Sequence, residues 1–124
     1  MHDGDKQIGI VNLNSLATFS TDKYERVPVA GSRGLIRLLC FQVGQRVPTH
    51  YHPKADEYFY VARGRGKVTF GEEEFDAGEG DIVRAPAGVR HRWVNTGKSL
   101  VLISMLVPPS SYKRADEAKE MIQV

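Results

Sequence analysis

The chain has 124 residues, 41% of them hydrophobic and 26% charged, ordinary proportions for a soluble globular protein with one domain and one core. Seventeen lysines and arginines against fifteen aspartates and glutamates leave a formal net charge of +2, dispersed along the chain, which argues against a nucleic-acid-binding surface. The single cysteine, Cys40, excludes an internal disulfide and, within the apolar segment 35–43, is expected to be a core residue.

Short strand-like segments follow one another along most of the chain. They are rich in β-branched and aromatic residues, are separated by Gly, Pro, Asn and Asp, and have no helical period between them. In chain order they are 7–13, 35–43, 57–64, 66–71, 81–86, 91–97 and 99–107, with 72–81 as a turn-rich stretch. This pattern predicts a small all-β barrel or sandwich.

Two segments lack this pattern. Residues 14–34 have mixed composition and are expected to wrap the barrel after an N-terminal strand, so that 1–34 forms a strand and a wrapping segment. In the tail 108–124, Ser110 or Ser111 would cap a short helix, although a frayed, charged terminus fits the composition as well.

The sequence contains no targeting signal. The N-terminus has no basic region followed by a long apolar run, so no signal peptide is expected. No window approaches the eighteen or so apolar residues that a membrane span needs. We therefore expect a cytoplasmic protein that does not bind a membrane.

Metal-ligating residue types gather in the stretch 50–57. His50 and His52 point to the same face of a strand because side chains alternate. Pro53 begins a turn, which allows Glu57 to return to the same interior, and His91 begins a later strand. Three imidazoles and one carboxylate suit a divalent transition metal. Histidines on strands are also common as surface or hydrogen-bonded residues, so the stretch alone leaves both interpretations open.

The spacings among ten residues, which include these four, extend this observation. Gly44, His50, His52, Glu57 and Gly64 are separated by five, one, four and six residues, and Gly80, Pro86, Gly88, His91 and Asn95 by five, one, two and three. These two series resemble the two sequence motifs of the cupin superfamily at every fixed position. The first motif covers 44–64 and the second 80–95, with 65–79 between them.

The resemblance implies a fold and a metal site. The fold would be a double-stranded β-helix of the jelly-roll type, forming a single cupin domain over 1–124. His50, His52, Glu57 and His91 match the family's metal ligands one by one. One divalent transition metal ion per chain is implied, drawn from Mn, Fe, Ni, Co, Zn and Cu, whereas Ca and Mg are disfavoured by the histidines.

The other motif residues are expected to have structural tasks at turns, where glycine adopts positive φ and proline presets it. They are Gly44, Gly64, Gly80, Pro86, Gly88 and Asn95.

Alternation also predicts a pocket wall. Phe59 shares a face with Glu57, Trp93 shares one with His91, and Gln42 lies on the preceding strand. Ordinary barrel core is the alternative for the two aromatic residues. The arginines near the motifs, Arg63, Arg65, Arg84, Arg90 and Arg92, would favour an anionic substrate at the rim or simply face solvent.

Two classes of function fit these residues. The first is a metalloenzyme acting on a small organic acid or sugar-like molecule, since cupin-like proteins include dioxygenases, decarboxylases and isomerases. No residue beyond the ligands is assigned as catalytic. The alternative is a non-catalytic module that binds or senses a small ligand with its metal; a third is a storage or stress protein with a structural metal. The resemblance also implies a homodimer, paired through a sheet face or an exchanged N-terminal strand.

Overall fold

The computed structural model describes residues 9–29, 35–109, 113–115 and 121–123. Its elements are one short helix and eleven strands in this part of the chain. In order they are α1 (Leu13–Leu16), β1 (Glu25–Pro28), β2 (Leu35–Phe41), β3 (His50–Tyr51), β4 (Asp56–Arg63), β5 (Arg65–Phe70), β6 (Glu73–Gly78), β7 (Ile82–Ala85), β8 (His91–Asn95), β9 (Leu100–Val107), β10 (Lys113–Ala115) and β11 (Met121–Gln123). The all-β prediction is confirmed.

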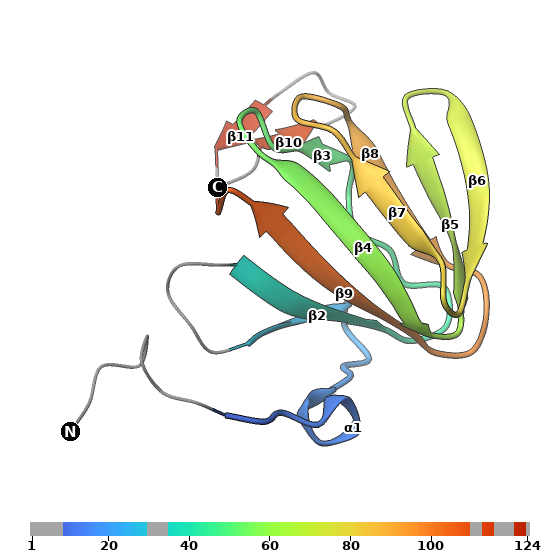
Figure 1. The fold of residues 1–124 in the computed structure, drawn as a ribbon. Helices are drawn as coiled ribbons and strands as arrows, with labels where there is room; N and C mark the ends of the chain where they lie inside the picture. The colour runs from blue at the N-terminus through green and yellow to red at the C-terminus, as the bar shows by residue number, and fades with distance from the viewer. Residues whose placement is uncertain (1–8, 30–34, 110–112, 116–120, 124) are drawn as a thin grey trace.

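The strands form two antiparallel sheets (Figure 1). One has the order β1-β2-β9-β4-β7 and the other β11-β10-β3-β8-β5-β6. Their inner faces enclose a core of aliphatic and aromatic side chains, because alternate residues of each strand point inward. On β4, Phe59 and Val61 are fully buried while Tyr60 faces outward. The core contains Leu39, Phe41, Val47, Phe59, Val61, Val68, Ala77, Ala85, Trp93, Leu100 and Leu102.

The N-terminal part differs from the prediction. Residues 9–12 lie in no strand and α1 begins at Leu13, so the strand predicted for 7–13 is wrong over the described residues; 7 and 8 lie outside them. The cause is Asn12, whose side chain caps the helix by accepting hydrogen bonds from Asn14 N and Ser15 N. The helix packs on the outer face of the five-stranded sheet, where Cys40 is fully buried.

Two further segments were mispredicted. The stretch 73–78, expected to be turns, is β6, which pairs with β5 as an edge strand. Its residues are mostly exposed, so the strand shows no apolar alternation. The short C-terminal helix is wrong where the tail is described, because 113–115 and 121–123 are strands. Pairing of β10 with β3 supplies backbone hydrogen bonds that outweigh the local preference for a helix. Ser110 and Ser111 lie outside the described residues.

Helix α1 spans only four residues, and the described part of the chain holds no helix long and apolar enough to cross a membrane.

Candidate metal centre

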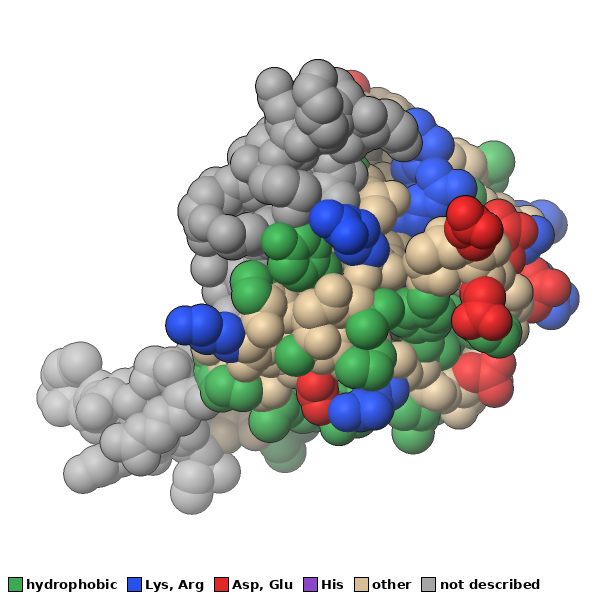
Figure 2. Space-filling model, turned by 90° about the horizontal axis from the view of Figure 1, so that it is seen from above, with side chains coloured by type: hydrophobic (Ala, Val, Ile, Leu, Met, Phe, Trp, Pro, Cys, Tyr) green, Lys and Arg blue, Asp and Glu red, His purple; other side chains and the backbone are tan. Residues whose placement is uncertain are grey.

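Four potential metal ligands converge inside one end of the barrel. His50 comes from β3, His52 from the turn after it, Glu57 from β4 and His91 from the start of β8. One ligand atom from each lies within 4.8 Å of the others, and all four residues are buried. The carboxylate oxygen Glu57 Oε1 lies 2.9 Å from His52 Nε2, 3.1 Å from His91 Nε2 and 3.9 Å from His50 Nε2. In the view of Figure 2, no histidine side chain is visible on the surface of the described residues.

Backbone pairing brings these residues together. His50 lies opposite His91 in the antiparallel register of β3 and β8. The turn before His91 is hydrogen-bonded to the turn after His50: Gly88 N donates to the His52 carbonyl at 2.9 Å. Gly88 has a φ of 82°, a left-handed conformation that glycine adopts without strain. Ala87 N donates to Asp56 Oδ1 at 2.9 Å, which ties the same turn to the start of β4.

Hydrogen bonds fix the tautomers of two histidines. His50 Nδ1 lies 2.8 Å from the Pro48 carbonyl, and His91 Nδ1 lies 3.0 Å from the Val89 carbonyl. A carbonyl oxygen only accepts, so each Nδ1 carries a proton and donates it. In the neutral ring each Nε2 then directs a lone pair toward Glu57 Oε1. A nitrogen lone pair that faces a carboxylate oxygen at such a distance repels it unless a cation or a proton lies between them. The Nε2 atoms and Glu57 Oε1 are therefore arranged as the ligands of a metal ion are.

The protonation states also suit a metal. Burial raises the pKa of Glu57, but its contacts with the ring nitrogens of His52 and His91 outweigh this effect and hold the pKa well below its usual range. Burial, followed by the charge of His91, lowers the pKa of His50 to about 3. Near neutral pH the carboxyl is therefore ionised and the His50 ring neutral, the forms in which both groups bind metal ions.

The second oxygen of Glu57 has separate partners. The Ser104 hydroxyl on β9 donates a hydrogen bond to Oε2. Arg37 on β2 places Nη2 at 3.5 Å from the same oxygen. Glu57 therefore offers Oε1 to the histidines while Oε2 is held from the five-stranded sheet. Sequence reasoning missed Arg37, although alternation along 35–41 places it on the inner face with Leu39 and Phe41.

A narrow pocket opens beside this centre. Its lining residues come from the N-terminal segment, the five-stranded sheet and the metal centre: Tyr24, Arg26, Arg37, Leu39, Val47, His50, Glu57 and Phe59. Of the predicted pocket residues, Phe59 lies in this wall. Trp93 lies in the core behind it, with ring centroids 5.4 Å apart.

Gln42, predicted for the wall, is not among the residues that line this pocket. It follows the last residue of β2, and its carbonyl accepts a hydrogen bond from Asn95 Nδ2 at 2.8 Å. The inward positions of β2 are odd-numbered, so the wall contains Leu39 instead. Asn95 also accepts from Gly97 N at 2.9 Å and so fixes the turn after β8.

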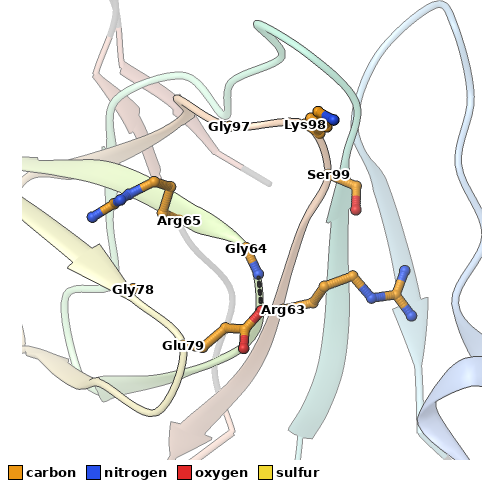
Figure 3. A pocket seen from close by; sticks show the side chains of 8 residues that line it. All are labelled: Arg63, Gly64, Arg65, Gly78, Glu79, Gly97, Lys98 and Ser99. Carbon is orange, nitrogen blue, oxygen red and sulfur yellow. Dashed lines mark hydrogen bonds between the residues drawn. The ribbon is translucent and has the colours of Figure 1, made fainter.

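The arginines that the sequence analysis noted near the two motifs do not line this pocket. Arg84 pairs with Asp56 at 3.0 Å and is largely exposed, and Arg90 lies over the Tyr51 ring. Arg63 and Arg65 line a shallow, open hollow at the other end of β4, shown in Figure 3. The hollow is built from Arg63, Gly64, Arg65, Gly78, Glu79, Gly97, Lys98 and Ser99.

Comparison with known proteins supports the resemblance to cupins that the two sequence motifs show. Residues 37–107, more than half of the chain, match the family described as "Cupin domain". The chain is 31% identical over 94 residues to "Polyketide synthase CurC" of Streptomyces cyaneus, covering 73% of this chain and 61% of that protein. The chain spans about three fifths of the length of the first curated relatives it matches.

Two solved structures share the fold. The protein TT1209 from Thermus thermophilus is 31% identical with a TM-score of 0.77, covering 82% of this chain and 98% of that one. A double-stranded β-helix protein from Klebsiella pneumoniae is 19% identical with a TM-score of 0.83, covering 90% and 100%. The double-stranded β-helix prediction is confirmed, and the chain belongs to the cupin family.

Proposed function

We propose that the chain binds one divalent transition metal ion through His50, His52, Glu57 and His91 and acts as a metalloenzyme on a small organic molecule. The observation that carries the proposal is the convergence of three buried imidazoles on one carboxylate oxygen, with two Nδ1 protons held by backbone carbonyls. Mn, Fe, Ni, Co, Zn and Cu all suit this ligand set.

The chain's own residues would prepare the site for chemistry. Pro48 and Val89 orient two imidazoles through their carbonyls, and Ser104 holds the outer oxygen of Glu57. Leu39, Val47 and Phe59 line the pocket with apolar surface, which limits access of water. When bound, the ion supplies Lewis-acid polarisation of a substrate oxygen, or activation of dioxygen if it is iron. Decarboxylase, isomerase and dioxygenase reactions use such chemistry.

Elemental analysis of untagged protein tests the metal centre. We expect near-stoichiometric transition metal in the unaltered chain and loss of most of it in His52→Ala. The matched control is His2→Ala, the same change at the one histidine outside the ligand set, which should keep its metal. Iron would direct the assays to oxygen chemistry, and manganese, zinc or nickel to lyase and isomerase reactions. Absence of metal from the unaltered protein, even after reconstitution, would overturn the proposal.

We also propose a homodimer paired through the outer face of the five-stranded sheet. Exposed apolar side chains lie there on adjacent strands: Tyr60 lies opposite Ile82, and Met105 lies opposite the half-buried Tyr58. Ile82 is 71% exposed, which is costly for an isolated sheet face. Light scattering should give twice the 13.8 kDa chain mass, and Ile82→Asp should shift the protein toward the single-chain mass. A single-chain mass for the unaltered protein contradicts the pairing.

A further inference from the structure

One side of the metal centre carries aromatic side chains that reach the surface. Phe70, the last residue of β5, lies opposite His91 in the register of β5 and β8, and the two ring centroids are 6.2 Å apart. Phe75 on β6 continues the series, with its ring centroid 6.1 Å from that of Phe70. Two steps of similar length therefore lead from a potential metal ligand to Phe75 at the sheet edge.

Phe75 is exposed because of its place in the sheet. Alternation along β6 puts it on the inner face with Ala77, which is buried. Strand β6 is the last strand of the six-stranded sheet, however, and Phe75 is 50% exposed. An inward-facing aromatic ring that stays in water forgoes the free energy that its burial would supply. A ligand that covered this ring would supply that burial.

The other sides of the centre leave little room for a ligand. The rings that lie around His91 in the described part of the chain belong to His50, His52, Phe59 and Phe70. The first three are buried, whereas Phe70 is only partly buried. The narrow pocket on the side of β2 has a free volume of about 10 Å³, room for about one water molecule. Of the sides formed by these residues, the Phe70 side is therefore the one on which a larger ligand can extend toward solvent.

We propose that the substrate of the metal centre carries an apolar group about the size of a phenyl ring, which lies against Phe70 and Phe75 while an oxygen-bearing group at its other end reaches the centre. Contact between aromatic rings stabilises a complex beyond the area that it buries, so these two side chains determine specificity. This inference rests on the proposed function and names a feature of its substrate.

The test is calorimetric titration of the metal-loaded protein with acetohydroxamate and with 3-phenylpropionohydroxamate. Both compounds carry the same metal-chelating group, and only the second has a ring, at the end of a short flexible chain. We expect the phenyl compound to bind about tenfold more tightly. Phe75→Ala should lower this ratio of the two Kd values about threefold or more, with the acetohydroxamate Kd unchanged within about twofold. Phe75→Tyr, which keeps the ring, should keep the ratio.

Tyr60→Ala is the matched control, since Tyr60 is also aromatic and 43% exposed but faces outward on β4; its ratio should stay within about twofold of that of the unaltered protein. Equal affinities for the two hydroxamates, or an unchanged ratio in Phe75→Ala at equal metal content, would overturn the inference and leave the metal centre standing. Failure of both compounds to bind the metal-loaded protein would also overturn it. Absence of metal from the unaltered protein would remove the proposed function and this inference together.

Discussion

The two ends of the barrel are built in different ways although β4 reaches both. At the metal-centre end, Glu57 and His91 are each 1% exposed and their side chains point toward one another. At the other end, roughly 20 Å along β4, the hollow is open and its charged side chains diverge (Figure 3). Arg63 reaches away from it to Asn14 Oδ1 at 2.5 Å. Polar side chains therefore converge on one another where the strands direct them inward, and they spread apart where the barrel is open.

The far end depends on backbone contacts. Gly64 N donates to Glu79 Oε2 at 3.0 Å, and Asn95 Nδ2 donates to the carbonyls of Phe41 and Gln42. Three of the eight residues that line the hollow are glycines. At this end hydrogen bonds to backbone groups close the barrel, whereas the opposite end holds the four potential metal ligands. The comparison implies that mutations at the two ends should damage different properties.

The largest expected effect is at Gly64. A Cβ there would lie 2.0 Å from the Ser99 carbonyl oxygen, and the φ of 82° is already unfavourable for other residues. Gly64→Ala should lower the free energy of unfolding by about 3 kcal/mol or more. Urea denaturation of the purified protein measures this change.

Gly44→Ala is its control, because Gly44 has a φ of 74° but nothing within 4 Å of an added Cβ. The control carries only the left-handed strain and should lose about 1 kcal/mol. Equal losses in the two variants would show that the close approach to Ser99 is unimportant.

A smaller effect, on metal affinity, is expected at Ser104. Its hydroxyl is a hydrogen-bond donor to Glu57 Oε2, so Ser104→Ala frees the carboxylate to rotate away from the histidines. Loss of such a supporting contact typically weakens metal binding about 10- to 100-fold. Competition with a chelator of known affinity measures it.

Ser99→Ala, at the far hollow, is the matched control and should keep its affinity. If the two serine variants bind metal equally well, Ser104 has no part in positioning Glu57.

The sequence predicted the four residues that converge, but only in part from local determinants: His91, 34 residues after Glu57, was grouped with the others by the resemblance of the two motifs. Two-residue alternation places His50 and His52 on one face, and Pro53 and Gly88 set the neighbouring turns. The strand β6 was not predictable from apolar alternation, since an exposed edge strand needs none. Strand β10 forms by pairing with β3, a contact between segments far apart in the chain.

The residues of the pocket wall were also only partly predictable from the sequence. Arg37 was within reach of the alternation rule applied to 35–41, but Tyr24 and Arg26 come from a segment with no clear period. Their position depends on the antiparallel register of β1 on β2, in which Arg26 lies opposite Leu39. Such a register is fixed by tertiary packing, which the sequence of one segment does not contain.

The hydrogen bond from Gly88 N to the His52 carbonyl joins the turns that carry two of the histidines. Ala87 N adds a second bond, to Asp56 beside Glu57. The two turns therefore form one cooperative unit in local unfolding: opening either breaks bonds to the other. Release of an ion would then follow the opening free energy of this unit, and His52, Glu57 and His91 would lose their mutual arrangement in one event. The Gly88 amide proton reports that opening directly through its rate of exchange with solvent.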